Sequence, residues 1–557
     1  MNQPFTKIGF ALFFPVALLS GAGPVTTKFV GSQACSRCHL QISVNYASSP
    51  MGLSMVPASE TRERVLPAGS QTVTNGNISF KVSRRGDDLY QEESQTDASG
   101  TLVFKKVYKL EYALGSGSNG ISYAVRKGNY IFEAPLSYYQ RDRAWHLSPG
   151  YEKTNAGFSR PLSSGCVTCH SGRVNAVPDR DGLYRDPAFS ELAIGCENCH
   201  GPGSLHVQKP ASSNIVNPAK LSGSRADEIC MNCHQAGDAR AFQQGKTSED
   251  VRPGIPLIDV LAIFKIPSSL SKDRANDLLE HHSSMQTSKC FQGSNGRLRC
   301  NTCHDPHARP TKTETTAYFD QKCLGCHTVS SCKRAVAPGL HSGSGCADCH
   351  MPKREIGTIS HSALTDHRIA ARPREPLPPV TNQPPAAKVA DLDLVNRSNS
   401  EPLSPLVLWQ AYGELSERQA HYQSRYFELL DVVAKQYPGN SLVQAALGRK
   451  IFRQGGPGAN ERAIIHLQTA IKSGFTAPTA FEDLADAFAA VGKADDSIDT
   501  LKQGLALSPY ASRLHKSLIL QYVTSKRYSL AKEEIRSYLE LFPEDSFIRD
   551  LLLKAGG

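Results

Sequence analysis

The chain has 557 residues, enough for about three or four domains, and no apolar run beyond its first 22 residues is long enough to span a membrane. A formal charge of +10 could suggest nucleic acid as a partner. Sixteen cysteines indicate bound cofactors instead, whose acidic groups the excess Lys and Arg residues would neutralise. We therefore expect neither nucleic-acid binding nor an integral membrane span after removal of a leader.

The first 22 residues predict export. Lys7 supplies a positive charge, residues 8–19 form an apolar run, and residues 20–22 are small, as a cleavage site requires. The run is short for a transmembrane helix, although an uncleaved anchor is the alternative. We predict a signal peptide over residues 1–22 and a periplasmic or other extracytoplasmic location.

The motif Cys-x-x-Cys-His occurs seven times in the chain. It is the attachment signature of c-type haem, in which two thiols form thioethers with the macrocycle and the histidine ligates the iron. A disulfide or zinc half-site would explain one such motif, but not seven with histidine always in the same place. The predicted attachment residues are Cys35, Cys38, Cys166, Cys169, Cys196, Cys199, Cys230, Cys233, Cys300, Cys303, Cys323, Cys326, Cys346 and Cys349. The predicted proximal iron ligands are His39, His170, His200, His234, His304, His327 and His350.

These motifs predict a cytochrome domain over residues 23–370 with seven c-type haems. Between the first two motifs, apolar and polar residues alternate and turn pairs such as Asn75-Gly76 and Lys127-Gly128 interrupt the pattern. That pattern is typical of hairpins and predicts a small antiparallel β subdomain over about residues 70–150. The rest of this domain is expected to be helical or irregular.

A haem with two protein ligands can only pass electrons, whereas an open sixth position can bind substrate. The candidate second ligands outside the motifs are Met51, His206, His281, His282, His307, His341, His361 and His367. This supply meets the demand of seven irons and favours an electron conduit. Two alternatives stay open: Met51 could pack beside a ring instead of ligating iron, and His281 and His282 would share one role. Cys290 and Cys332 remain outside the motifs and could form a disulfide or stay free thiols.

The last part of the chain changes character. Prolines are frequent over residues 371–405, which predicts a linker. Residues 406–557 are helical in pattern, and apolar positions recur at an offset of 34: Leu484/Leu518, Phe488/Tyr522 and Leu501/Ile535. This period is typical of tetratricopeptide repeats, with an ordinary helical bundle as the alternative. The fold class expected overall is therefore α+β followed by an all-α solenoid, whose concave face would dock a partner protein.

Several motifs resemble those of a known family. CENCHGPGSLH, CNTCHDPH and CADCHMPKR followed by SHSALTDHRI are similar to multihaem c-type cytochromes of the group that includes nitrite reductase, hydroxylamine oxidoreductase and small multihaem electron carriers. The layout as a whole resembles exported multihaem cytochromes that end in tetratricopeptide repeats. The resemblance implies that His206, His307, His361 and His367 are distal ligands. It differs at Met51, where the small carriers have histidine, and no Cys-x-x-Cys-Lys motif of pentahaem nitrite reductases occurs.

The sequence thus predicts an exported heptahaem cytochrome that relays electrons and docks a redox partner through its repeats. The alternative is a multihaem oxidoreductase of the nitrite, hydroxylamine or sulfur-oxyanion type. Its open haem would be that of Cys166, with Tyr138, Tyr139, Arg143 and His146 as possible proton and hydrogen-bond donors. The sequence leaves open the direction of electron flow, the pairing of distal ligands with haems, and the oligomeric state.

Overall fold

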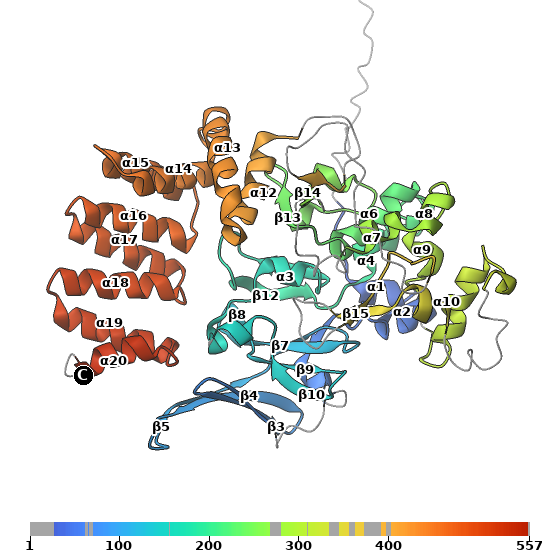
Figure 1. Cartoon of the computed structure of the whole chain (residues 1–557), viewed down its shortest axis with the longest axis horizontal. Coiled ribbons are helices and arrows are strands. Elements are labelled where there is room, and N and C mark those ends of the chain that lie inside the picture. Colours follow the sequence, from blue (N-terminus) through green and yellow to red (C-terminus); the bar gives the residue numbers. More distant parts are fainter. Residues whose placement is uncertain are drawn as a thin grey trace, which may run out of the picture.

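The computed structural model describes residues 27–61, 65, 71–154, 156–267, 280–308, 310–332, 345–355, 363–372, 392–396 and 403–554. The expected leader, His341 and His361 lie outside these residues. The fold is a mixture of small antiparallel sheets, short helices and a C-terminal column of longer helices (Figure 1). Within the described ranges, no helix has both the length and the apolar character needed to cross a bilayer.

Two antiparallel sheets form the first compact region. One has the order β2-β3-β4-β5, and the other has the order β1-β6-β7-β9-β10 with β8 paired to β7. Gly76, Gly86 and Gly128 occupy hairpin turns at φ near +60°, where glycine meets no Cβ clash. The bounds are β1 Met55–Pro57, β2 Thr72–Asn75, β3 Ile78–Arg85, β4 Asp88–Thr96, β5 Leu102–Lys109, β6 Tyr112–Leu114, β7 Gly120–Lys127, β8 Tyr130–Glu133, β9 Leu136–Tyr139 and β10 Ala144–Leu147.

One hydrophobic core joins the two sheets. Phe80, Tyr123, Phe132 and Trp145 belong to a single buried cluster. Met55 lies in a neighbouring cluster with Val167, so this methionine is a core residue rather than a candidate ligand.

The haem motifs lie on or beside short helices that share little regular structure. These helices are α1 Ser32–Ser36, α2 Leu40–Ala47, α3 Ser164–Thr168, α4 Cys196–His200, α5 Ser204–Gln208, α6 Gly223–His234, α7 His281–Thr287, α8 Lys289–Gly293, α9 Cys300–Cys303, α10 Thr315–Leu324 and α11 Cys346–His350. The accompanying strands are β11 Arg173–Ala176, β12 Tyr184–Glu191, β13 Ala239–Phe242, β14 Leu261–Lys265, β15 Lys353–Glu355, β16 Ala363–Thr365 and β17 Asp393–Leu394. This part therefore has small apolar clusters instead of one continuous core.

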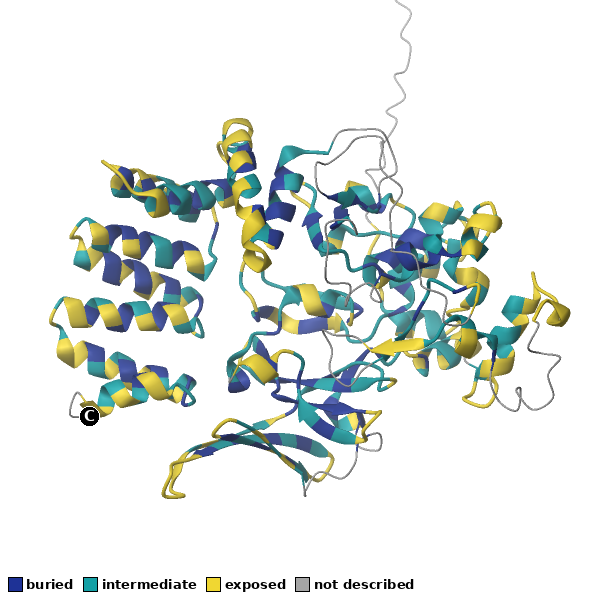
Figure 2. Ribbon diagram, in the orientation of Figure 1, coloured by how far each residue is buried: buried dark blue, intermediate teal, exposed yellow. Residues whose placement is uncertain are grey.

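The C-terminal helices pack as antiparallel pairs in a column, which we call the helical column. They are α12 Pro405–Arg418, α13 Gln423–Gln436, α14 Ser441–Gln454, α15 Ala459–Lys472, α16 Pro478–Ala490, α17 Ala494–Leu507, α18 Ser512–Thr524, α19 Tyr528–Leu541 and α20 Ser546–Lys554. The residues predicted from the 34-residue period are buried, including Leu484, Leu518, Leu501 and Ile535. Buried and exposed positions alternate along each helix, as tetratricopeptide-like packing requires (Figure 2).

The helical column is attached to the rest of the chain at both ends. Trp409 and Tyr412 of α12 share a buried cluster with Ala239 of β13 and Phe264 of β14. At the other end, the Ser159 hydroxyl donates at 3.2 Å to the carboxylate of Glu544, which lies between α19 and α20. The column therefore packs against its own cytochrome part through two separate contacts.

Candidate haem sites

We number the seven attachment segments in chain order: 35–39, 166–170, 196–200, 230–234, 300–304, 323–327 and 346–350. Four of their histidines lie close to a second imidazole from another part of the chain, and in three of these pairs the ring centroids are about 6 Å apart. The ring centroids are 6.4 Å apart for His39 and His206, with 16° between the planes. They are 5.9 Å and 13° for His200 and His307. They are 6.1 Å and 32° for His304 and His367.

These separations are larger than direct ring stacking needs and fit one metal ion between each pair. An imidazole nitrogen bonds a transition metal at about 2.0–2.1 Å, so two rings on opposite sides of one ion have centroids about 6 Å apart. His39, His304 and His307 are classed as exposed although protein segments surround them. Each pair therefore has the spacing expected of two ligands on one iron.

Backbone carbonyls fix the orientation of several of these rings. The Nδ1 atom of His200 lies 2.9 Å from the Val216 carbonyl, and that of His206 lies 3.0 Å from the Ala211 carbonyl. Because a carbonyl only accepts, Nδ1 carries the proton and Nε2 keeps its lone pair. His350 and His367 make the same contact, with the Ala370 carbonyl at 2.7 Å and the Thr365 carbonyl at 3.0 Å. Such outer hydrogen bonds are typical of metal-ligating histidines.

His281 lies between two other rings of the candidate set. Its centroid is 5.3 Å from that of His234 and 4.4 Å from that of His367. Its Nε2 atom is buried and has no hydrogen-bond partner among the described residues. Burial, followed by the nearby His367, lowers the pKa of His281 to about 3, so this ring is neutral. A buried, neutral and unpartnered imidazole nitrogen is suited to metal ligation.

The neighbouring His282 points elsewhere. Its Nδ1 atom is also buried without a hydrogen-bond partner in the described part of the chain, but its charged neighbours are Asp227 and Arg299. The two adjacent histidines therefore face different surroundings, whereas the sequence suggested one shared role.

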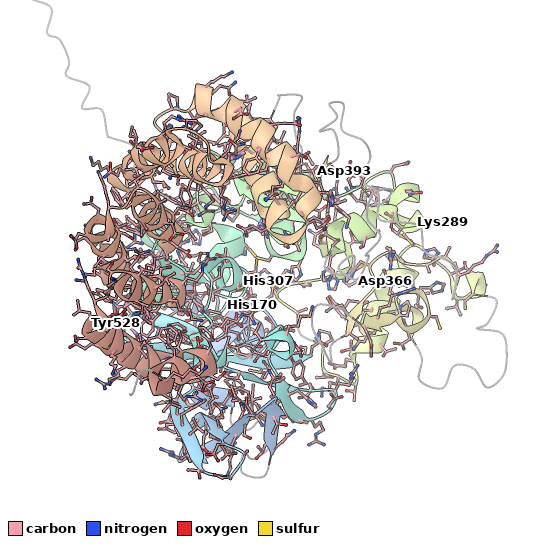
Figure 3. The ribbon with its side chains drawn as sticks, turned by 60° about the vertical axis from the view of Figure 1, so that its left-hand side comes forward. His170, Lys289, His307, Asp366, Asp393 and Tyr528 are labelled. Atoms are coloured by element: carbon pink, nitrogen blue, oxygen red, sulfur yellow. The ribbon has the colours of Figure 1, made fainter. Side chains whose placement is uncertain are left out.

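The remaining candidates are less closely engaged. Met51 lies in the turn after α2 and is partly exposed. Within the described ranges, no second imidazole stacks on His170 or His327. His170 lies toward the middle of the molecule, as does His307 (Figure 3). Burial lowers the pKa of His170, so it too is neutral.

Buried carboxylates that the sequence analysis did not single out connect the attachment segments. Glu197 lies inside the third segment and is only 2% exposed. Its carboxylate accepts from the backbone N–H groups of Val30, Gly31 and Gly203 at 2.7–3.0 Å. A charged acceptor with several backbone donors is a strong local restraint. The third segment is thereby tied to the chain that leads into the first.

Three more carboxylates follow the same pattern. Glu191 accepts from the backbone N–H of Ser32 at 2.9 Å. Asp227 accepts from that of Cys300 at 3.3 Å, and Asp320 accepts from that of Cys346 at 2.7 Å. In each case a carboxylate near one attachment segment accepts from a free backbone N–H group in the first turn of the helix that carries a different attachment segment. In the sequence, the only sign of these joining carboxylates is an acidic residue just before or within a motif.

The possible disulfide between Cys290 and Cys332 is not formed; both residues are separate thiols. Cys290 lies on α8, where burial raises the pKa of its thiol and the nearest sulfur that acts on it is that of Cys326. Cys332 follows the sixth segment and is exposed. The two thiols thus have different surroundings. Their closeness to the same motifs in the sequence does not bring them together in the fold.

The residues suggested for an open second haem lie on the β9–β10 hairpin. Tyr138 packs on Trp145, and the Tyr139 hydroxyl donates to the Leu147 carbonyl at 3.1 Å. Arg141, at the turn of this hairpin, pairs with Glu355 at 2.8 Å. Glu355 ends β15, which follows the seventh segment, so this contact brings the hairpin to the seventh segment rather than the second.

Comparisons with known proteins agree with the motif assignment. A family model described as a doubled CXXCH motif matches residues 294–331. The C-type polyheme cytochrome OmcB of Geobacter sulfurreducens, in strains PCA and DL-1/KN400, is 23% identical over 246 residues. That match covers 37% of this chain and 30% of the relative, so the chain spans about a third of the length of these relatives.

Solved structures also match. The outer cell wall cytochrome OcwA is 16% identical, with a TM-score of 0.37, over 83% of this chain and 99% of that one. The first TPR of Spaghetti (RPAP3) bound to an HSP90 peptide is 20% identical, with a TM-score of 0.19, over 21% of this chain and 93% of that one. The motif and the curated relatives support c-type haem binding in a multihaem cytochrome, and the column itself is TPR-like.

Proposed function

We propose that this chain is an exported heptahaem cytochrome c that relays electrons and docks a redox partner through its helical column. The observation that carries the proposal is the set of imidazole pairs at about the separation of two ligands on one iron. When bound, c-type haem supplies a one-electron couple at its iron. Two protein ligands on an iron leave no position for substrate, which favours transfer over catalysis.

The pairings we propose follow the ring geometry. His206 closes the first site opposite His39, His307 closes the third opposite His200, and His367 closes the fifth. His281 closes the fourth site opposite His234, with the shorter centroid distance of 5.3 Å. Each of these ligands comes from outside the segment that it closes. The segments are therefore interdependent, and we expect the chain to reach this fold only after haem attachment.

The second, sixth and seventh sites need further ligands. His282 and Met51 are described candidates, and His341 and His361 are candidates outside the described residues. The carbonyl contact of His350 supports the same orientation for the seventh proximal ligand as for His200. We propose that these candidates close the remaining irons.

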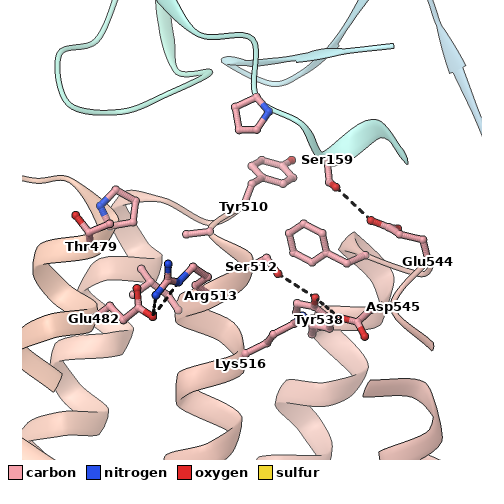
Figure 4. Close-up of a pocket in the computed structure, with 15 residues that line it drawn as sticks. Ser159, Thr479, Glu482, Tyr510, Ser512, Arg513, Lys516, Tyr538, Glu544 and Asp545 are labelled. Carbon is pink, nitrogen blue, oxygen red and sulfur yellow. Dashed lines mark hydrogen bonds and ion pairs between the residues drawn. The ribbon is translucent and has the colours of Figure 1, made fainter. Parts of the chain in front are cut away.

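The helical column is the proposed docking module. A cavity of about 560 Å³ opens between α16, α18 and α19 and the segment that precedes the second attachment site. Tyr510, Tyr538 and Arg513 are among its lining side chains, and Ser159 bonds Glu544 across it at 3.2 Å (Figure 4). Aromatic and charged side chains of this kind suit an extended peptide segment of a partner. Docking here would bring the partner to the second site.

One experiment tests the relay. Electron paramagnetic resonance of the oxidised holoprotein is expected to give only low-spin ferric signals, and carbon monoxide added to the reduced protein is expected to leave its absorption spectrum unchanged. A high-spin signal that responds to nitrite or carbon monoxide would overturn the pure relay. Haem counting by mass spectrometry checks the number seven independently.

A second candidate function is a multihaem oxidoreductase with one open site. The specific observation in its favour is His170, on which no other described imidazole stacks. Reduction of nitrite or hydroxylamine by the reduced holoprotein, lost on His170→Ala but retained in His206→Ala, would favour this candidate. A carrier with no open site would show neither activity.

A further inference from the structure

The contacts between attachment segments define an order that differs from the sequence order. The first and third segments are joined because Glu191 accepts from Ser32 and the Ser32 hydroxyl accepts from the Cys196 N–H at 2.9 Å. The fourth and fifth are joined by Asp227 and Cys300. The sixth and seventh are joined by Asp320 and Cys346.

Two further contacts connect these three pairs. Asn198 of α4 and Asn232 of α6 line one small cavity, so the third segment lies beside the fourth. The fifth and sixth segments meet where α9, which carries the fifth segment, packs against α10, which leads into the sixth. The contacts therefore run from the first segment through the third, fourth, fifth and sixth to the seventh.

The second segment is absent from this path and lies at its side. The Cys169 sulfur is 3.9 Å from the carbonyl of Asn232, a residue of the fourth segment. The backbone after His170 also touches the third segment, since the Asn198 amide donates to the Gly172 carbonyl at 3.1 Å. The sulfur contact nevertheless places the second segment against the fourth.

Arg240 of β13 lies at this meeting point. Its guanidinium donates at 2.8 Å to the Asn232 carbonyl, the same carbonyl that the Cys169 sulfur contacts. Its backbone N–H donates to the Glu414 carboxylate of α12 at 2.9 Å. Among the described residues its guanidinium forms no ion pair with a carboxylate, so the positive charge acts on the two segments without local neutralisation.

We infer that the fourth attachment segment is a three-way junction that contacts the third, fifth and second segments, and that Arg240 is a positioning residue whose charge acts on the haems of the second and fourth. This inference rests on the proposed relay and deepens it. A relay built on this order has three ends instead of two. Its side arm is the second segment. The residues just before this segment line the cavity that opens against the helical column.

The charge of Arg240 gives the first test. A nearby positive charge favours the reduced iron, so Arg240→Gln is expected to lower two of the haem potentials in a titration followed by magnetic resonance. Arg425→Gln removes the same charge from a surface pair on α13 and is expected to lower none. A shift of no haem, or of haems spread over the whole set, would overturn the role of Arg240.

Removal of the second haem gives the second test. Cys166→Ala combined with Cys169→Ala is expected to lower the haem count by one and to change the potential of one further haem, the same that responds to Arg240→Gln. If the haems of His39 and His200 changed together instead, the second segment would be a link between them and the junction would be wrong. A high-spin signal in the wild-type spectrum would contradict the relay itself. This outcome separates a failure of the proposed relay from a failure of the proposed junction.

Discussion

The imidazole rings of His39 and His206 lie 6.4 Å apart and 16° from parallel, although they come from segments far apart in the sequence. A centroid separation of this size between two imidazoles fits one iron that both rings ligate, and it is too wide for direct ring stacking. The Ala211 carbonyl holds the His206 ring by its Nδ1 atom, so Nε2 keeps its lone pair for a metal ion. The first site is therefore built by the chain around the third.

His206→Ala should open the first site. Loss of one of two imidazole ligands converts a low-spin ferric haem to high spin, so one haem should gain a high-spin resonance and a carbon monoxide response. Added imidazole should restore the low-spin signal. His466→Ala is the control, because His466 lies in α15 and bonds only the Gln444 side chain at 2.7 Å. An unchanged spectrum in His206→Ala would contradict the pairing.

Glu197→Ala should destabilise the joint between the first and third segments. The substitution leaves one buried and two partly buried backbone N–H groups without their acceptor, which should cost about 2 kcal/mol. Urea unfolding followed by haem absorbance measures this, and the first transition should move to lower urea. Glu197→Gln, which keeps one acceptor oxygen, should lose less. Exposed Glu249, changed to Ala, should lose little, and equal effects of the two Ala variants would refute the restraint.

Local patterns in the sequence predicted the hairpins and the helical repeats that the structure shows, and the assignment of the attachment residues rests on a pattern of the same kind. Each depends on a short spacing: two intervening residues for the thiols, alternation for strands such as β3, and an offset of 34 for pairs such as Leu484 and Leu518. Such spacings express local geometry and need no knowledge of the rest of the fold.

Contacts between distant segments were not predictable in the same way. The eight distal candidates were found by residue type, but which ring faces which depends on how irregular loops pack, as His281 and His282 illustrate. The role of Asp227 was missed because an acidic residue before a motif looks like ordinary surface. The packing of Tyr412 against Ala239 was missed for a similar reason, since the proline-rich stretch before α12 suggested separation.

The contact between the helical column and the β sheets should depend on pH through Glu93. This side chain is buried on β4 beside Lys106, Lys127 and Glu544, and burial followed by Glu544 raises its pKa to about 8. Because the pKa of Glu93 is higher in the folded than in the unfolded chain, folding favours the protonated carboxyl. The free energy of unfolding is therefore highest below the pKa of the unfolded chain and falls as the pH rises toward 8. The slope should be at most about 1.4 kcal/mol per pH unit.

Lys127 contributes the opposite sign at higher pH. Burial lowers the pKa of Lys127 to about 8, so folding favours the neutral amine. The free energy of unfolding is therefore highest above pH 10.5, the pKa of an unburied lysine, and falls as the pH falls toward 8. Together the two groups predict a minimum of stability near pH 8. Thermal unfolding followed by circular dichroism should show this minimum, and Glu93→Gln should reduce the fall from pH 5 to 8, with the remainder due to groups such as Glu544, whose pKa burial also raises. A fall of the same size in Glu93→Gln would exclude Glu93 as its cause.

Truncation should distinguish the two attachments of the helical column. A chain that stops after residue 403 lacks Trp409 and Tyr412, which pack on Ala239 and Phe264, and each lost aromatic contact should cost about 2 kcal/mol or more. Because β13 also carries Arg240, this loss should reach the second and fourth attachment segments.

A chain that stops after residue 440 is the matched control. It keeps α12 and α13 and removes the rest of the column, α14 to α20, including the contact of Glu544 with Ser159. We expect it to retain its haem count and low-spin spectrum and to lose partner association. The shorter chain should be more sensitive to protease and show altered potentials of the second and fourth haems. Equal behaviour of the two chains in haem potentials would mean that α12 does not support the junction.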